Sequence, residues 1–157
     1  MHRNKGFTLV EILIVVIILG ILAAIVIPQF TEASNDARES ALRSDLQTLR
    51  SQIELYKIQH LDRFPSQDEG EAVGVMDAAE FVTDLTVKTN QAGTTVVADG
   101  ALDYGAYLQS FPGNPFVDGD NTVTIGAGAP LGDGATGWHF NTTTGKVSPN
   151  DADHDDL

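Results

Sequence analysis

An uninterrupted apolar run near the N-terminus limits what this chain can fold into. The run Phe7–Ile27 has 21 residues, and its only polar side chains are Thr8 and Glu11. At 1.5 Å of rise per residue, a helix of this length spans about 30 Å, the thickness of the hydrocarbon core of a bilayer. Arg3 and Lys5 precede the run, and short positively charged flanks stay in the cytoplasm. The sequence therefore predicts a single-pass membrane helix with a cytoplasmic N-terminus.

An alternative interpretation of the same run is a secretory signal peptide, with Leu22-Ala23-Ala24 as a loose cleavage site. Two features favour the membrane helix. A carboxylate at Glu11 is costly next to hydrocarbon, and such residues are rare there unless they have a partner and a function. Beyond the run, residues 31–63 continue in good helix formers and contain neither Gly nor Pro.

The second part of this predicted helix is amphipathic. Six residues recur at intervals of four and three positions, which predicts one buried stripe: Leu42, Leu46, Leu49, Ile53, Tyr56 and His60. We therefore expect one rod with a transmembrane half, residues 7–28, and an amphipathic half, residues 29–63. Gly20 loses more backbone entropy than other residues, and Pro28 removes a hydrogen-bond donor. We expect a kink or local melting between these two residues.

The remaining chain has a different composition and carries the charge. From residue 64 onward, 15 acidic residues face only two cations, Lys88 and Lys146, so the whole formal net charge of −13 lies there. Nucleic acid is not expected as a partner, because phosphate binding needs clustered cations. The absence of cysteine excludes disulfides. We expect a globular α/β head over residues 64–149 and an acidic tail over residues 150–157.

The head is predicted to contain a short helix and a small sheet. Asp77-Ala-Ala-Glu80 has the pattern of a capping box that opens a helix through about Leu85. Residues 121–125 predict a strand, and residues 138–141 with 146–147 predict a hairpin. A sheet this small cannot close a core alone, so the stripe of the long helix supplies the other half. The expected fold class is α+β, with a long N-terminal helix packed on a small antiparallel sheet.

Catalysis finds no support in the sequence. There is no nucleophile elbow, HExxH motif or phosphate-binding loop, so we expect no enzyme activity. Asp118-Gly-Asp120-Asn121 offers oxygen atoms at alternate positions of a loop, which makes Asp118 and Asp120 candidate calcium ligands. The alternative is a turn rich in Asp and Asn. No other cofactor is expected.

The segment from Lys5 to Pro28, KGFTLVEILIVVIILGILAAIVIP, resembles the N-terminal signature of type IV pilins and of type II secretion pseudopilins. The resemblance rests on a short basic leader that ends in Gly6, the aromatic Phe7, and Glu11 four residues later, followed by Gly20 and Pro28. The head also resembles major pseudopilins and disulfide-free pilins at residues 104–108, 111–115, 137–140 and 145–147, but it lacks the calcium loop of the Ser-Leu-Gly-Ala-Asp-Gly type that many major pseudopilins have.

This resemblance implies a precursor with the leader 1–6, a prepilin peptidase that cuts between Gly6 and Phe7, and methylation of the new amine of Phe7. It implies extraction from the bacterial inner membrane by an assembly platform, and a helical filament of identical subunits with minor pilins or pseudopilins, in the periplasm or outside the cell. A type II secretion major pseudopilin is the preferred interpretation, and a surface pilin for adhesion or motility is the alternative. A permanently anchored envelope protein that binds cations or a protein is a further alternative.

The resemblance also gives Glu11 an expected role in assembly. In a filament, this carboxylate lies among apolar neighbours, and the cation at that depth is the amine of Phe7 from its own chain or an adjacent one. Two charges about 4 Å apart attract by roughly 4 kcal/mol at an effective dielectric of 20. We therefore expect Glu11 to fix the register of an incoming subunit, the alternative being a Glu that extends to water at the membrane interface. Gly20 and Pro28 would supply the flexibility to leave the bilayer.

Overall fold

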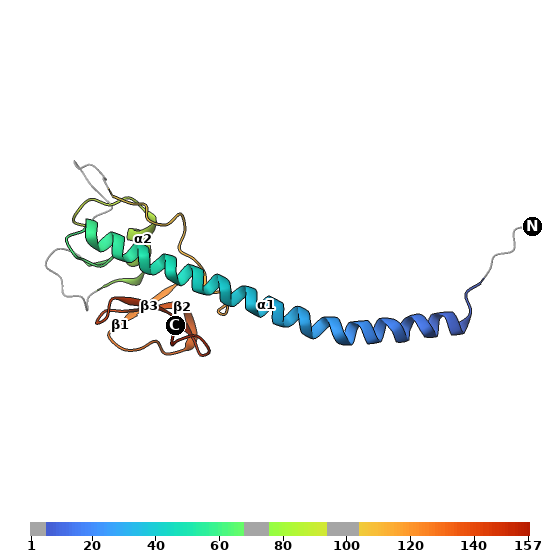
Figure 1. Ribbon diagram of the computed structural model, residues 1–157. Helices are drawn as coiled ribbons and strands as arrows, with labels where there is room; N and C mark the ends of the chain where they lie inside the picture. The colour runs from blue at the N-terminus through green and yellow to red at the C-terminus, as the bar shows by residue number, and fades with distance from the viewer. Residues whose placement is uncertain (1–5, 68–75, 94–103) are drawn as a thin grey trace, which may run out of the picture. The chain divides into compact units, whose positions relative to one another are not determined.

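The computed structural model describes residues 6–67, 76–93 and 104–157, and it has the α+β fold that the sequence predicts. Its elements are α1 (Leu9–Gln59), α2 (Ala78–Thr86), β1 (Val123–Gly126), β2 (Asp133–Asn141) and β3 (Lys146–Asp151), as labelled in Figure 1. The chain divides into two compact units, Met1–Arg38 and Glu39–Leu157. The long N-terminal helix and the small sheet confirm the expected fold class.

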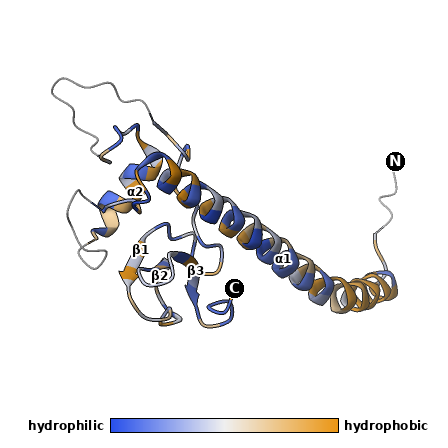
Figure 2. Ribbon diagram, turned by 60° about the vertical axis from the view of Figure 1, so that its left-hand side comes forward, coloured by the Kyte–Doolittle hydropathy of each residue, from blue (hydrophilic) through white to orange (hydrophobic). Residues whose placement is uncertain are grey.

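From Ile12 to Ile27, the helix of the first unit is apolar on every side. Between Leu9 and Ile27 the large apolar side chains are 50–81% exposed, and Figure 2 shows this part of α1 in hydrophobic colours all round. By length and composition α1 is apolar enough to cross a membrane. The chain itself therefore provides no cover for these side chains among the described residues.

The backbone of α1 remains helical through Gly20 and Pro28. The expected local melting is therefore absent, because an apolar helix tolerates the loss of one backbone hydrogen bond at a proline while the rest of its ladder holds. A role for Gly20 and Pro28 in helix flexibility stays a prediction.

The core of the second unit confirms the predicted stripe. All six of its members, from Leu42 to His60, are buried. The first five, from Leu42 to Tyr56, share one apolar cluster with Phe81 and Leu85 of α2 and with residues of the sheet and its loops, namely Phe111, Val123, Trp138, Phe140 and Val147. The amphipathic half of α1 thus forms one wall of the head core, as the small size of the sheet requires.

The predicted cap of α2 is also confirmed. The carboxylate of Asp77 accepts hydrogen bonds from the backbone N–H groups of Ala79 and Glu80, both at 2.9 Å. These are two of the donors that a helix N-terminus leaves without partners. The N–H of Asp77 donates to the hydroxyl of Ser66 at 2.7 Å, rather than to Glu80 as a full capping box would require.

The sheet has the order β1-β2-β3, and one of its two pairings differs from expectation. The hairpin of β2 and β3 is antiparallel, with Phe140 opposite Val147, as predicted. β1 pairs with β2 in parallel, with Val123 opposite Trp138, where we expected antiparallel strands throughout. The reason lies in the connection: about a dozen residues separate Gly126, the end of β1, from Trp138. A connection of this length lets the chain return to the start of β1, as a parallel pairing needs.

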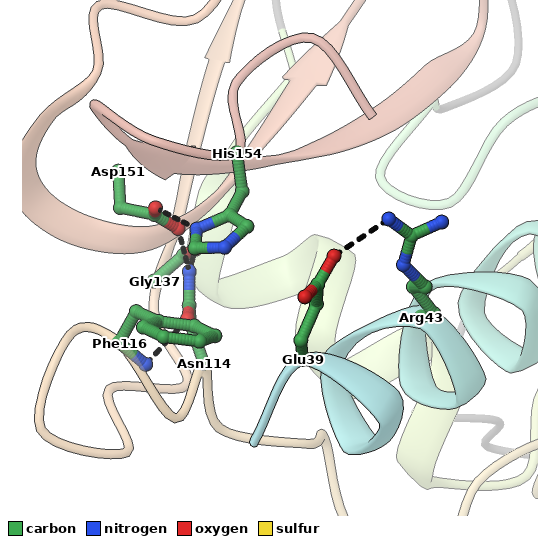
Figure 3. Close-up of polar contacts among 7 residues, drawn as sticks. All are labelled: Glu39, Arg43, Asn114, Phe116, Gly137, Asp151 and His154. Atoms are coloured by element: carbon green, nitrogen blue, oxygen red, sulfur yellow. Dashed lines mark hydrogen bonds and ion pairs between the residues drawn. The ribbon is translucent and has the colours of Figure 1, made fainter. Parts of the chain in front are cut away.

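The acidic end of the chain is attached to the head. β3 extends to Asp151, inside the segment expected as a tail, and Asn114 Nδ2 donates to Asp151 Oδ2 at 2.9 Å. Figure 3 shows His154 between Asp151, whose Oδ1 lies 2.5 Å from His154 Nδ1, and the ring of Phe116. In the same view, Arg43 and Glu39 of α1 form an ion pair at 2.6 Å. Hydrogen bonding from Arg43 lowers the pKa of Glu39.

A buried polar network holds the end of α1. The ring of His60 stacks on Tyr56 at 3.8 Å between centroids, and its Nε2 lies 2.8 Å from the hydroxyl of Thr89. The hydroxyl of Tyr56 donates to Asp84 Oδ2 at 3.1 Å, and the N–H of Ser66 donates to the same oxygen at 2.8 Å. The network therefore joins α1, α2 and the loops on either side of α2.

Burial lowers the pKa of His60, because a charged imidazole loses its hydration among the surrounding rings; its hydrogen bond to the carbonyl of Tyr56 opposes this effect in part. The unfolded chain therefore binds a proton at this residue at a higher pH than the folded chain does. Above about pH 6.5, the ordinary pKa of histidine in an unfolded chain, His60 is neutral in both states and does not affect the free energy of unfolding. As the pH falls below that value, His60 lowers the free energy of unfolding, because the unfolded chain takes up the proton more readily. Besides Thr89, the groups that face His60 are Tyr56, Tyr104, Tyr107, Arg63 and the backbone of Asn90, whose hydrogen bond also opposes the lowering of the pKa.

We expect the full chain in detergent to unfold at a lower urea concentration at pH 5.5 than at pH 7.5. The decrease in the midpoint urea concentration should be smaller in a His60→Gln variant. The fluorescence of Trp138, the one tryptophan of the sequence and a fully buried core residue, reports the unfolding in urea. The comparison removes contributions from other titrating groups, since only residue 60 differs. Equal pH dependence in the two proteins would contradict the assigned role of His60.

Candidate functional site

The predicted processing and assembly residues lie at the start of α1. The helix begins at Leu9, directly after Thr8. One carboxylate oxygen of Glu11 accepts from the Thr8 N–H at 3.1 Å and from the Thr8 hydroxyl at 3.0 Å. In return, the N–H of Glu11 donates to the Thr8 hydroxyl oxygen at 3.2 Å. Thr8 and Glu11 thus form a reciprocal capping box.

This capping box is a function of Glu11 that our sequence analysis missed. The signal was present, because Thr8-x-x-Glu11 directly before an apolar run is the usual pattern of a helix N-terminus. A carboxylate in the first turn also interacts favourably with the positive end of the helix dipole. Glu11 therefore has partners within its own turn. The predicted partner, a free amine at Phe7, does not arise while Gly6 precedes it, so that pairing stays a prediction.

The predicted cleavage position is open to solvent. Phe7 is 79% exposed, and a side-chain carbon placed on Gly6 would meet no atom within 4 Å. Beside them, an open apolar hollow of about 550 Å³ follows the first turns of α1 from Phe7 to Val16. An exposed, non-helical peptide bond before a helix is a typical position for proteolysis. The predicted basic residues of the leader, Arg3 and Lys5, lie outside the described residues.

The other predicted residues lie away from this turn. Gly20 and Pro28 are nine and seventeen positions after Glu11, or about 13 and 25 Å along a helix. They contact neither Phe7 nor Glu11 through any hydrogen bond, and a side-chain carbon at Gly20 would meet open space. The structure thus brings together Gly6, Phe7 and Glu11 but not the two flexibility candidates.

The candidate calcium ligands do not form a metal cluster. Asp120 Oδ1 accepts from the N–H and the hydroxyl of Thr122, both at 2.6 Å, and these hydrogen bonds lower the pKa of Asp120. Within the described ranges, no three His, Cys, Asp or Glu side chains gather to hold a metal ion. Calcium prefers six to eight oxygen ligands, so Asp118 and Asp120 alone fall short of a site. Calcium binding there stays a prediction.

Comparison with known proteins identifies the family. Residues 1–27 match the family described as the prokaryotic N-terminal methylation motif. The type IV major pilin protein PilA of Myxococcus xanthus is 33% identical over 166 residues, which cover 96% of this chain and 68% of that protein. The chain belongs to the type IV pilin family.

Other members of the family are similar over a shorter stretch. Type II secretion system core protein G of Dickeya chrysanthemi is 38% identical over 69 residues, 44% of this chain and 44% of that protein. The same protein of Pseudomonas aeruginosa is 37% identical over 69 residues, 44% of this chain and 48% of that protein. Each match thus spans less than half the length of the relative. No solved structure matches significantly.

Proposed function

We propose that the chain is a structural subunit of a helical, type IV pilus-like filament. The observation that carries the proposal is the position of the methylation motif. It covers residues 1–27 and ends on the apolar segment of α1, whose large side chains have no cover within the described chain. A bilayer covers such a segment before assembly, and other copies of the segment cover it afterwards. The subunit is a building element and not an enzyme.

Processing by a prepilin peptidase follows from this proposal. The peptidase cuts between Gly6 and Phe7 at the cytoplasmic face of the inner membrane and methylates the amine of Phe7. The exposure of both residues supports access to this bond. Cleavage removes Arg3 and Lys5, which hold the N-terminus on the cytoplasmic side, so the subunit becomes easier to extract. An inner-membrane assembly platform and minor pilins or pseudopilins are the further partners in this proposal.

Glu11 acquires a second role after cleavage. The Thr8–Glu11 capping box uses one carboxylate oxygen of Glu11, and the new amine of Phe7 adds a charged partner within a turn of the helix. In the apolar interior of a filament, an unpaired carboxylate commonly costs 3 to 5 kcal/mol by order of magnitude. The amine of an adjacent copy removes that cost only when the two helices are in register.

Two variants separate the charge of Glu11 from its cap. Glu11→Gln keeps a capping-box side chain but removes the charge, whereas Thr8→Ala weakens the cap by about 1 kcal/mol and keeps the charge. We expect Glu11→Gln to insert in the membrane normally and to lower the yield of sheared filaments at least tenfold, with Thr8→Ala close to wild type. Immunoblots of the membrane and filament fractions measure both. Normal filament yield in Glu11→Gln, or loss only in Thr8→Ala, would contradict the charge role.

Type II secretion is the machine that we propose first, with this chain as its major pseudopilin. Its support is the similarity to type II secretion system core protein G in several bacteria. A surface pilus is the second candidate, and the similarity to PilA favours it because that match covers 96% of this chain, and hence the head as well as the helix.

Deletion of the gene in its own organism distinguishes these two candidates. For a pseudopilin, we expect exoproteins to accumulate in the periplasm and surface fibres to persist. For a surface pilin, we expect fibres and surface motility to disappear and the secreted proteins to be unchanged. Complementation with the wild-type gene is the control. A deletion strain with normal secretion, normal surface fibres and normal motility would contradict the proposed filament function.

A further inference from the structure

The chain closes one edge of its small sheet. β3 forms this edge, and the guanidinium of Arg50 on α1 donates two hydrogen bonds to the carbonyl of Val147, at 3.1 and 2.9 Å. Two positions further along, Pro149 has no N–H with which to pair. An occupied carbonyl and a proline both prevent a further strand from adding at an edge. β3 is therefore protected against pairing with another chain.

The other edge of the sheet is β1, and half of its backbone groups turn outward. In a parallel pair, alternate residues of a strand turn both their N–H and their C=O toward the neighbouring strand. The N–H of Trp138 donates to the carbonyl of Thr122 at 3.1 Å, so Thr122, and with it every second residue, faces β2. Val123 and Ile125 lie between these residues. Their N–H and C=O groups therefore turn away from β2.

The outward groups of Val123 and Ile125 have no hydrogen-bond partner among the described residues. β1 also has none of the protection found on β3, because Val123–Gly126 includes neither a proline nor a charged side chain. We call this the open edge of β1. Such an edge is a template for a further strand. Donors and acceptors alternate along it at the spacing of an extended backbone, so the occupant that satisfies them all is a polypeptide.

A surface hollow beside the open edge provides room for side chains. It has a volume of about 390 Å³, and its mostly apolar lining comes from α2 and from the start of β1: Ala78, Ala79, Val82, Asn121, Thr122 and Val123. The side chains of an added strand project alternately to the two faces of the sheet. Those on the face that α2 covers enter the hollow, which favours apolar side chains at every second position.

Charge selects the kind of segment that fits. The stretches that contain the lining residues, 76–85 and 117–126, include no Lys, Arg or His, and they carry the exposed acids Asp77, Glu80 and Asp118. From residue 64 onward, acidic residues outnumber cations by 15 to two, so a second copy of the head is repelled. A segment with cationic ends is attracted instead. The complementary occupant is therefore a basic, extended segment of a different protein.

We infer that the open edge of β1 and the hollow beside it bind an extended segment of another protein, which adds to the sheet as a further strand. The outward N–H and C=O groups of Val123 and Ile125 pair with the backbone of this segment. Its apolar side chains enter the hollow at every second position, and Lys or Arg residues at its ends face Glu80 and Asp118. This binding surface does not depend on the proposed filament function, so its failure leaves that proposal standing.

Hydrogen exchange of single backbone amides, measured by NMR on the full chain in detergent, tests whether the edge is open. The N–H groups of Thr124 and Gly126 face β2, whereas those of Val123 and Ile125 face outward. We expect the outward pair to exchange at least tenfold faster than the inward pair. Equal exchange of all four amides would show that the chain itself closes this edge, which overturns the inference. Slower exchange of the outward pair at higher protein concentration would also overturn it, because the occupant would then be a second copy.

An added peptide tests the kind of occupant. The probe is the acetylated and amidated peptide Lys-Val-Ser-Val-Thr-Val-Lys at millimolar concentration. One control peptide has Glu in place of both Lys residues. A second control carries N-methyl groups on two adjacent central residues, which removes a donor from each edge of the peptide.

We expect the probe to slow amide exchange at Val123 and Ile125 at least fivefold, and each control peptide to slow it less than twofold. No effect of the probe would overturn the inference. An equal effect of the Glu peptide would show that charge does not select the segment, and an equal effect of the N-methylated peptide would show that backbone pairing is not used. Either result also overturns the inference.

Reversal of one charge beside the hollow gives a second test. In Glu80→Lys we expect the dissociation constant of the probe to rise at least threefold and that of the Glu peptide to fall. Asp153→Lys, which changes an equally exposed acid beyond β3, is the matched control and should alter neither constant by as much as twofold. Urea unfolding followed by Trp138 fluorescence verifies that both variants fold. Equal dissociation constants in two folded variants would place the peptide elsewhere and overturn the inference.

Discussion

The apolar surface of α1 is the constraint on which the rest of the structure depends. In the second unit, the apolar stripe from Leu42 to Tyr56 is covered by α2 and the sheet, which gives the small head its core. Between Leu9 and Ile27 the described chain offers no cover, so a bilayer or other copies must supply it. One helix therefore combines an intramolecular and an intermolecular way of removing apolar surface from water.

The capping box gives Glu11 partners that the sequence interpretation, which treated this residue as an unpaired charge, did not include. Thr8 gives Glu11 two hydrogen bonds in the first turn, so the carboxylate is partnered before any processing. In the proposed filament, cleavage adds a cation one turn away without disturbing those bonds. Local capping and intermolecular pairing then depend on the same side chain, and only the second requires its charge.

Local patterns were predictable from the sequence, whereas distant pairings were not. The buried stripe follows from helical periodicity, and the Asp77 cap follows from one side chain and its nearest N–H groups. The parallel pairing of β1 depends on where the chain returns after Gly126, which periodicity does not encode. We expected residues 150–157 to form a tail because their charge favours solvation. Asp151 instead accepts a hydrogen bond from Asn114, which is distant in the sequence, and pairs with His154 across a turn. At the N-terminus, the Thr8-x-x-Glu11 pattern of a capping box was present in the sequence. We interpreted Glu11 by its charge instead, as a residue that needs a cation.

The mass of the N-terminal peptide of the protein, purified from its own cells, tests the central claim most directly. The account predicts a chain that begins at N-methylated Phe7, because the exposed bond after Gly6 precedes a capped, apolar helix. A chain that begins after Ala24 would show signal-peptide removal and a secreted domain without the apolar segment. That result would contradict the proposed filament and the role of Glu11 in its assembly.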